Sequence, residues 1–158
     1  MFGLKNKFKS QESLTRKLIT ESYGNLRKMT KKAKTINDVL RYTFVLPIQT
    51  YADFVHQIIE RLSNLDYQVP EHKIWNAWQN IGTERDRGYR GINITIISSQ
   101  NQKFELQFHT RASFELKTET HDLYKEARLT ETLPERREEI KEIVLKKAEK
   151  IEIPKGVI

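Results

Sequence analysis

The sequence Phe104-Glu105-Leu106-Gln107-Phe108-His109-Thr110 alternates apolar and polar side chains with the two-residue period of a β-strand. Residues 92–97 alternate in the same way, and the turn-forming residues 98–101 lie between the two runs. The two runs together predict an antiparallel hairpin. Glu105 and Gln107 are expected on its polar face, whereas the phenylalanines and Leu106 are expected on its apolar face.

The remaining segments predict helices and further strands around this hairpin. Residues 39–46 are rich in β-branched and aromatic side chains and end before Pro47, which predicts a strand with Asp38 at its start. Helical periodicity predicts helices over residues 11–33, with a break near Gly24, and over 51–65, 112–128 and 134–151. A twisted strand is expected within residues 67–79. The predicted fold class is α+β, with a mixed and mainly antiparallel sheet of about four to five strands flanked by helices.

Size and composition predict one globular domain over residues 1–158. The chain has 37% hydrophobic and 31% charged residues, which is a globular rather than a disordered composition. It contains no cysteine, so disulfides and zinc–thiolate sites are excluded. No apolar run approaches the roughly 18 residues of a membrane span, and no signal peptide is evident at the start. We therefore expect a cytoplasmic protein without a membrane partner.

The charge of the chain predicts an anionic partner. The formal net charge is +7, and the excess is concentrated in residues 1–34, where ten lysines and arginines face only Glu12 and Glu21. These cations include the spacing Lys7-x-Lys9-Ser10-x-x-Ser13-x-x-x-Lys17. At a helix start, such cations and free N–H groups can converge on one anion. A basic helix that lies in solvent or on nucleic acid is the alternative interpretation.

Asp38 and Glu105 form a candidate pair of metal ligands. If their strands are neighbours, the two carboxylates can hold Mg²⁺ through oxygen atoms while nucleotide phosphates complete the coordination shell. A solvated strand face is the alternative for Glu105 and Gln107 taken alone.

The loop Arg85-Asp86-Arg87-Gly88-Tyr89-Arg90-Gly91 is a candidate phosphate and base site. Its glycines permit close backbone approach, its arginines can bind phosphate oxygens, and a base can stack on Tyr89. A solvated turn is the alternative, since the chain has neither a Walker A motif nor G-x-G-x-x-G. The four histidines lack metal-binding spacing, which argues against a zinc protease. His121 lies one helical turn from Lys125 and is a candidate for the same pocket; a capping or core role is its alternative.

Taken in order, these motifs resemble the synthetase domain of the RelA/SpoT family, from about Lys7 to Lys125. The N-terminal spacing is similar to the family's basic ATP motif R-x-K-x-x-x-S-x-x-x-K. Arg85-x-x-Gly88-Tyr89-x-Gly91-x-Asn93 is similar to the acceptor loop K-x-x-G-Y-x-S-x-H. Glu105-x-Gln107-x-His109-Thr110 is similar to the E-x-Q-x-R-T strand. The version it resembles most is the divergent one found in phage-borne proteins and toxin domains.

The resemblance implies a pyrophosphokinase that moves the β,γ-pyrophosphate of ATP to a ribose 3′-hydroxyl. Asp38 and Glu105 would hold Mg²⁺ or Mn²⁺, and Glu105 would accept the hydroxyl proton while Gln107 steadies it. The implied ATP-binding residues are Lys7, Lys9, Ser13, Lys17 and Arg41. The implied acceptor-binding residues are Arg85, Arg87, Tyr89, Asn93 and His121. Implied partners are ATP with an acceptor nucleotide or tRNA, and a second copy of the chain or an antitoxin or immunity protein.

Several residues depart from the family pattern. Thr43, Gly91, Asn93 and His109 stand where the family commonly has Arg, Ser, His and Arg. These departures leave the acceptor open between guanine nucleotides, adenine nucleotides and the tRNA 3′ end. Residues 134–158 lie beyond the resemblance and predict a C-terminal helix; oligomerisation and a lid are both open as its role.

Two other functional classes remain open. One is a Mg²⁺-dependent nuclease, whose cores pair an aspartate with an E-x-K strand; Gln107 in place of that lysine argues against it. The other is a non-catalytic module that binds nucleotides or nucleic acid, which the departures at Lys7, Thr43 and His109 permit.

Overall fold

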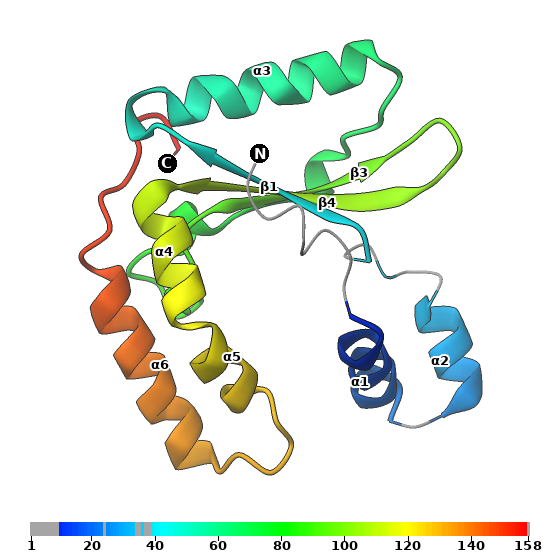
Figure 1. Cartoon of the computed structure of the whole chain (residues 1–158), viewed down its shortest axis with the longest axis vertical. Coiled ribbons are helices and arrows are strands. Elements are labelled where there is room, and N and C mark those ends of the chain that lie inside the picture. The colour runs from blue at the N-terminus through cyan, green and yellow to red at the C-terminus, as the bar shows by residue number, and fades with distance from the viewer. Residues whose placement is uncertain (1–9, 24, 34–35, 37–38, 158) are drawn as a thin grey trace. The chain divides into compact units, whose positions relative to one another are not determined.

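The computed structural model describes all residues except 1–9, 24, 34–35, 37–38 and 158 (Figure 1). The chain forms two compact units that each draw on three segments. Unit 1 comprises Met1–Phe44, Ile59–Ile74 and Asn93–Gln107. Unit 2 comprises Val45–Ile58, Trp75–Ile92 and Phe108–Ile158.

A four-stranded sheet with the order β1-β4-β3-β2 runs through the fold. Its strands are β1 (Arg41–Leu46), β2 (Ile74–Asn76), β3 (Ile92–Ile97) and β4 (Lys103–Thr110). The predicted hairpin is confirmed, and its turn is closed by the Ser98 N–H, which donates to the Gln102 carbonyl at 2.9 Å. Side chains of β1 contact β4 in the same order along both strands, Arg41 at Glu105 and Thr43 at Gln107, so this pair is parallel. The α+β class and the mixed sheet are therefore confirmed.

The core of unit 1 is built on the apolar side of the hairpin. Ile94, Ile96 and Leu106 are buried there, as the two-residue alternation predicts. The Phe104 ring makes edge-to-face contacts with Tyr42 and Tyr67 at centroid distances of 6.2 and 6.0 Å. Such contacts add to the burial of apolar area and fix the apolar face of the hairpin.

Unit 1 also contains the contacting helices α1 (Gln11–Ser22) and α2 (Leu26–Ala33). Ser10 caps α1, because its hydroxyl accepts the Ser13 N–H at 3.2 Å. Tyr23 ends α1 in the left-handed region with φ 52°. The predicted break in this helical stretch is confirmed, and it begins at Tyr23.

Unit 2 has a core of large side chains. Tyr51, Trp78 and Phe108 are fully buried. The Tyr51 hydroxyl donates to the Phe108 carbonyl at 2.7 Å and accepts from the Trp78 indole N–H at 3.4 Å. Burial of this hydroxyl raises the pKa of Tyr51. Tyr51 opens α3 (Tyr51–Asn64), so the predicted helix over 51–65 is confirmed.

Three further helices of unit 2 pack on one another: α4 (Arg111–Glu119), α5 (His121–Ala127) and α6 (Pro134–Ala148). The prediction of one helix over 112–128 is wrong, because the helix is interrupted at Thr120. The hydroxyl of Thr120 donates to the Leu116 carbonyl at 2.8 Å. Pro134 begins α6 as predicted. The guanidinium of Arg136 joins α6 to α5 through two bonds to Glu126, at 2.7 and 3.2 Å.

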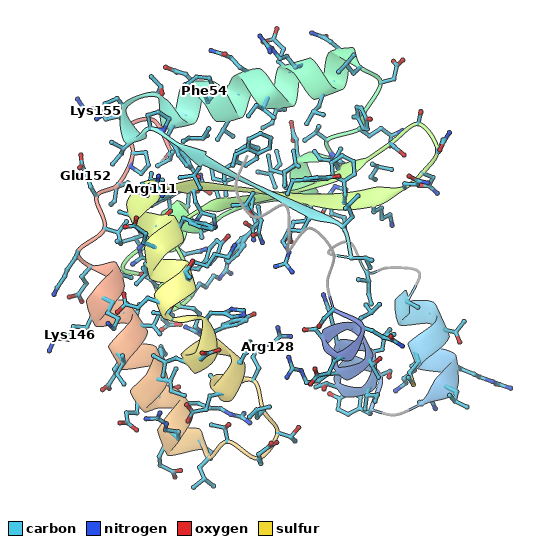
Figure 2. All side chains as sticks on the ribbon, viewed as in Figure 1. Phe54, Arg111, Arg128, Lys146, Glu152 and Lys155 are labelled. Carbon is cyan, nitrogen blue, oxygen red and sulfur yellow. The ribbon has the colours of Figure 1, made fainter. Side chains whose placement is uncertain are left out.

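The remaining differences concern strand and helix ends. The strand expected within 67–79 is limited to β2, because short 3₁₀ helices at Glu71–Lys73 and Ala77–Asn80 flank it. Helix α6 ends three residues before its predicted end, and its exposed side chains include Lys146 (Figure 2). Within the described residues, no helix has the length and apolarity needed to cross a membrane.

Candidate functional site

Four side chains of unit 1 form what we call the carboxylate cluster: Arg41, Thr43, Glu105 and Gln107. The Gln107 side-chain amide donates to Glu105 Oε1 at 2.6 Å. Arg41 Nε lies 4.0 Å from the same oxygen, and the Thr43 hydroxyl donates to Gln107 Oε1 at 3.5 Å. The cluster arises because β1 and β4 are parallel neighbours whose alternate residues share a face. Gln107 therefore orients the Glu105 carboxylate while Thr43 contacts the other end of its amide.

The carboxylate cluster is partly removed from water. Gln107 is only 4% exposed, and the side chains of Glu105 and Arg41 are 20% and 30% exposed. The expectation of a solvated polar face therefore does not hold at Gln107. Arg41 Nε is buried, and among the described residues it has no hydrogen-bond acceptor. The hairpin register fixed at Ser98 and Gln102 places Asn93 of β3 opposite Gln107.

The chemistry of this cluster suits a hard divalent cation only in part. The Glu105 carboxylate is an oxygen donor of the kind that Mg²⁺ and Mn²⁺ prefer. Asp38, the second predicted ligand, lies outside the described residues. Within the part of the chain that the structure describes, no three metal-ligating side chains gather at one place. The described residues therefore contribute one of the two predicted carboxylate ligands.

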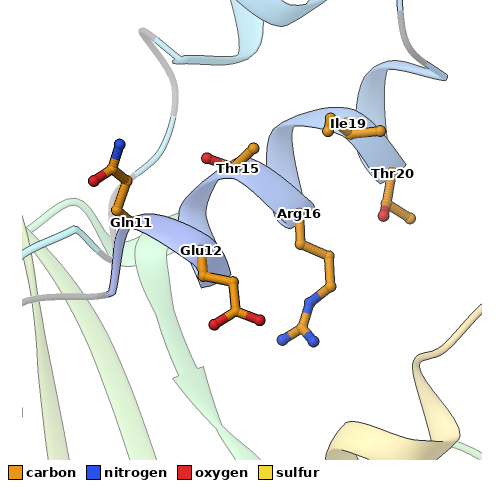
Figure 3. A pocket seen from close by; sticks show the side chains of 6 residues that line it. All are labelled: Gln11, Glu12, Thr15, Arg16, Ile19 and Thr20. Atoms are coloured by element: carbon orange, nitrogen blue, oxygen red, sulfur yellow. The ribbon is translucent and has the colours of Figure 1, made fainter.

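The predicted ATP-binding residues of the N-terminal segment divide into two groups. Lys7 and Lys9 lie outside the described residues. Ser13 and Lys17 are half-buried and lie one turn apart on α1. An open pocket of about 720 Å³ lies along this helix (Figure 3), and its lining residues are Gln11, Glu12, Thr15, Arg16, Ile19 and Thr20. Since Ser13 and Lys17 do not line it, this pocket is not the predicted phosphate site.

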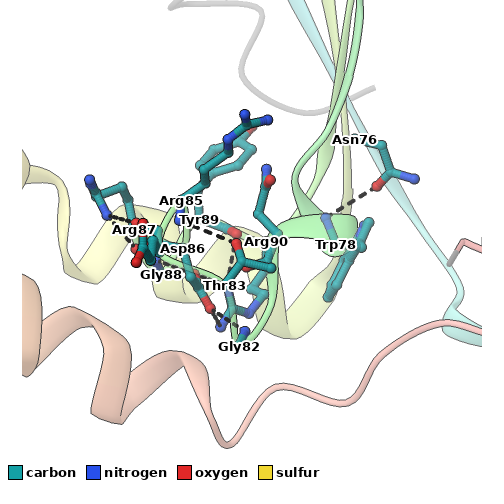
Figure 4. Close-up of polar contacts among 12 residues, drawn as sticks. Asn76, Trp78, Gly82, Thr83, Arg85, Asp86, Arg87, Gly88, Tyr89 and Arg90 are labelled. Atoms are coloured by element: carbon teal, nitrogen blue, oxygen red, sulfur yellow. Dashed lines mark hydrogen bonds and ion pairs between the residues drawn. The ribbon is translucent and has the colours of Figure 1, made fainter.

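The loop that precedes β3 is organised by a buried ion pair in unit 2 (Figure 4). Arg90 Nη1 and Nη2 donate to the two carboxylate oxygens of Asp86 at 2.8 and 3.1 Å. Burial alone would raise the pKa of Asp86, but the bonds from Arg90 and from the Gly88 N–H lower it below its usual value. Arg90 is 3% exposed, so it stabilises the loop and does not meet a ligand phosphate.

The other two arginines of this loop are exposed. Arg87 donates from Nη1 to the carbonyls of Glu84 and Asp86 at 2.7 and 3.0 Å, so part of its guanidinium is used within the loop. The Arg85 backbone N–H bonds to the Thr83 hydroxyl at 3.2 Å, while its side chain extends from the loop (Figure 4). Of the loop's three arginines, Arg85 and Arg87 are therefore the ones available to an anion.

Tyr89 belongs to a second group in unit 2, which we call the aromatic platform: Trp75, Tyr89 and His109. The rings of Trp75 and Tyr89 are stacked, with centroids 5.0 Å apart and planes inclined by 19°. The Tyr89 hydroxyl and His109 Nε2 are 3.0 Å apart and share a hydrogen bond. His109 Nδ1 is in turn 3.0 Å from the Ser113 hydroxyl at the start of α4. Tyr89 is thus held both by its ring face and by its hydroxyl.

His109 is fully buried, and its pKa is lowered to about 3. Burial is the main cause, and the positive charge of Lys117 acts in the same direction. The imidazole is consequently neutral near pH 7. It supplies no positive charge at the position where the family pattern has an arginine.

The structure brings some of the predicted residues into contact, while others belong to different compact units. Glu105, Gln107 and Arg41 are in contact, although Arg41 was predicted to bind ATP and here lies beside the carboxylate. His121 is exposed on the first turn of α5. Sequence reasoning missed Trp75, because it lies in the segment where periodicity was ambiguous. No local pattern in the sequence signals that its ring meets Tyr89, because the two residues lie 14 positions apart.

Comparison with known proteins gives matches among solved structures. Neither family models nor curated protein sequences match the chain. Small alarmone synthetase 1 from Bacillus subtilis, bound to its product pppGpp, is 18% identical with a TM-score of 0.60 over 90% of this chain and 68% of that chain. A GTP pyrophosphokinase family protein from Streptococcus pneumoniae is 15% identical with a TM-score of 0.58, over 89% of this chain and 66% of that one.

A bacterial secretion effector has a similar architecture. The Type VI effector Tas1, solved in complex with its immunity protein, is 17% identical with a TM-score of 0.52, over 90% of this chain and 77% of the matched chain. The TM-scores show that the fold is shared. The sequence identities are too low to carry over the chemistry, which is argued from the site. The chain therefore has the RelA/SpoT-type synthetase fold that its motifs predict, the fold of small alarmone synthetases and of this effector.

Proposed function

We propose that this chain is a pyrophosphokinase, which transfers the β,γ-pyrophosphate of ATP to the ribose 3′-hydroxyl of a purine nucleotide. The observation that carries the proposal is the Glu105 carboxylate, oriented at 2.6 Å by Gln107 on β4 of a synthetase fold. GDP, GTP, ADP and ATP are the acceptors we favour, and the tRNA 3′ end is the alternative. The shared fold of an effector with an immunity protein supports a toxic role with an immunity partner as part of the proposal.

The chemical step that we propose is an in-line attack. The acceptor 3′-oxygen forms a bond to the β-phosphorus of ATP, the bond from that phosphorus to the α,β-bridging oxygen breaks, and AMP leaves. The 3′-hydroxyl proton passes to Glu105. Gln107 would hold this carboxylate in place beside Arg41.

The other proposed roles concern binding and charge. Lys7, Lys9, Ser13, Lys17 and Arg41 would bind the phosphates of ATP. Arg85 and Arg87 would bind the acceptor phosphates, with Tyr89, Asn93 and His121 on the acceptor side. Asp38 and Glu105 would hold Mg²⁺ or Mn²⁺. The cation, when bound, would neutralise charge on the transferred phosphates.

Transfer of labelled pyrophosphate tests the function directly. Purified protein is incubated with γ-labelled ATP, Mg²⁺ and one acceptor at a time: GDP, GTP, ADP, ATP, AMP or deacylated tRNA. We expect label to move to a purine nucleotide with equal release of AMP. Glu105→Gln should lower kcat by about 10²-fold or more, the usual contribution of a positioned general base. Lys146→Gln, on the exposed side of α6, is the matched control and should retain full activity.

Other results would change the assignment. Nucleotide binding without label transfer to any acceptor would replace the enzyme with a non-catalytic binding module. Transfer that survives in Glu105→Gln would keep the pyrophosphokinase and remove Glu105 as its base. Transfer to tRNA alone would retain the reaction and change the acceptor.

A further inference from the structure

We propose that the purine base of the acceptor nucleotide stacks on Trp75, and that Tyr89 and His109 are positioning residues that hold the indole ready for it. The inference rests on the pyrophosphokinase function proposed above, because that reaction requires an acceptor nucleotide. It assigns a base-binding role to a residue outside the motifs by which the chain resembles its family.

The two tryptophans of the chain differ in burial. Trp78 is fully buried in the core of unit 2, where its indole N–H donates to Tyr51. Trp75 lies only three residues earlier, on β2, and is 47% exposed. Large aromatic side chains in globular proteins are mostly buried, and those left exposed on rigid elements are enriched at binding sites. Trp75 therefore calls for an explanation that core packing does not give.

The indole of Trp75 is held in one orientation. Its ring stacks on Tyr89 with centroids 5.0 Å apart and planes inclined by only 19°. This contact covers one face of the Tyr89 ring, so a base cannot stack on that face without displacing Trp75. A stacked pair of aromatic rings gives a flat apolar surface at little entropic cost, since neither ring must be ordered when the base arrives.

Tyr89 is held in place by His109. Its hydroxyl is 3.0 Å from His109 Nε2, and the two rings meet edge to face at 5.3 Å. The other imidazole nitrogen is 3.0 Å from the hydroxyl of Ser113, whose backbone N–H bonds to Thr110. A fully buried imidazole with a partner on each nitrogen has little freedom to rotate. Tyr89 and, through it, Trp75 are consequently tied to the junction of β4 and α4.

Gly91 and His109, which both depart from the family pattern, lie next to each other. A Cβ atom on Gly91 would lie 3.0 Å from His109 Cε1, 3.2 Å from His109 Nδ1 and 2.8 Å from the Phe108 carbonyl oxygen. A serine at position 91 would thus press against the buried imidazole and the adjacent strand. Gly91 and His109 therefore belong together, since the missing side chain makes room for the ring that holds Tyr89.

The ligand class follows from this chemistry. Any base can stack on an aromatic ring, and the larger purine ring covers more of an indole than a pyrimidine does. Exposed Arg85 and Arg87, in the loop that carries Tyr89, supply cations for phosphate groups. Neutral His109 adds no charge to this set. We therefore assign a purine nucleoside diphosphate or triphosphate, recognised more by stacking than by charge.

Tryptophan fluorescence tests the inference independently of catalysis. Wild-type protein is titrated with GDP, ADP and UDP under selective excitation of tryptophan. We expect the purine nucleotides to quench the emission, since a base stacked on an exposed indole quenches it. Trp75→Phe should abolish the quench while the emission of buried Trp78 remains. Calorimetric titration of Trp75→Ala should show a loss of purine affinity of roughly 5- to 150-fold, the range that one lost base–aromatic stack produces.

Matched variants separate the proposed role from a general loss of structure. Phe54→Ala removes another exposed aromatic ring, 41% exposed on α3, and should leave nucleotide affinity unchanged. His109→Asn, which removes the imidazole that holds Tyr89, should raise the acceptor KM more than it lowers kcat. If an equally destabilised variant away from the aromatic platform raises the acceptor KM as much as His109→Asn does, the role of His109 is structural only.

The outcomes distinguish this inference from the proposed function. Purine binding that Trp75→Ala leaves unchanged overturns the role of Trp75, whether or not transfer occurs. Purine binding that depends on Trp75, without any label transfer, supports the base site and overturns the pyrophosphokinase. Failure of the wild-type protein to bind any of the nucleotides overturns both.

Discussion

At the scale of single residues, strand β4 carries a charged carboxylate at Glu105 and a buried, neutral imidazole at His109. Glu105 is a carboxylate with Arg41 at 4.0 Å and the Gln107 amide at 2.6 Å, so it is a candidate for accepting a proton. His109 lies four residues later on the same strand and is buried. The neutral imidazole bonds to Tyr89 and Ser113 and serves to fix an aromatic ring. At a position where the family pattern has an arginine, this chain therefore has a neutral group that bonds to an aromatic ring.

The buried imidazole predicts a pH dependence of stability. The pKa of His109 is about 3 in the folded protein and ordinarily 6.5, so the unfolded chain binds more protons between these values. Stability should therefore be complete above about pH 6.5 and fall as the pH decreases toward 3. Between pH 7 and pH 5 the expected loss is about 2 kcal/mol in the free energy of unfolding. Urea unfolding at the two pH values measures it.

The groups around His109 define the control. Lys117 of α4 lowers its pKa, whereas the Tyr89 and Ser113 hydroxyls and the backbone of Arg90 are its polar neighbours. His109→Asn should be less stable at pH 7 but should lose little further stability at pH 5. His72→Gln, at an exposed histidine, should behave like the wild type at both values. A wild-type slope that His109→Asn retains would assign the pH dependence to other groups.

At the scale of elements, the sequence predicted those features that depend on local signals. The alternation of the hairpin, the helix from Tyr51 and Pro134 at the first turn of α6 are all encoded within a few residues. The break at Thr120 was missed, because the flanking residues keep helical periodicity across it. The Trp75–Tyr89 stack joins residues 14 positions apart in segments without regular periodicity. Local patterns cannot report such a contact.

The packing of the Tyr89 loop on α6 also could not be predicted from the sequence. Substitutions at two glycines of this region test it. Gly88 and Gly82 share φ +74°, a backbone conformation that costs an alanine roughly 1–2 kcal/mol. An added Cβ at Gly88 would lie 2.5 Å from Val144 Cγ1 and 3.1 Å from the Val144 backbone, whereas at Gly82 it would meet nothing within 4 Å. Gly88→Ala should therefore be the more destabilising by roughly 1–3 kcal/mol, the usual cost of overpacking. Urea unfolding of the two variants gives the difference.

The double variant Gly88→Ala with Val144→Ala distinguishes side-chain overlap from backbone strain. Removing Val144 Cγ1 should recover part of the extra cost, while the contacts with the Val144 backbone retain the rest. Equal stability of Gly82→Ala and Gly88→Ala would mean that the loop does not pack on α6 in solution. The acceptor KM should rise in Gly88→Ala, since the loop carries Tyr89.

At the scale of the whole molecule, the two units are interleaved along the chain. All four strands and helix α3 have residues in both units, so the boundary falls within hydrogen-bonded elements. Neither unit corresponds to a continuous segment that can be excised without cutting a strand. Helices α1 and α2 differ from this pattern, because they lie entirely in unit 1 and expose Ile19 and Leu26.

This interleaving predicts how the molecule opens in native-state hydrogen exchange. Amides of Ile94, Ile96 and Leu106 in unit 1 should exchange with the same free energy as those of Tyr51 and Trp78 in unit 2, because shared strands make the opening cooperative. That free energy should equal the global value from urea unfolding. The amides of α1 and α2 should exchange at lower free energies, since few of their apolar side chains are buried. If the hairpin amides exchange at a much lower free energy than the amides of unit 2, unit 1 opens by itself. Strand continuity then does not make the carboxylate cluster and the aromatic platform open together.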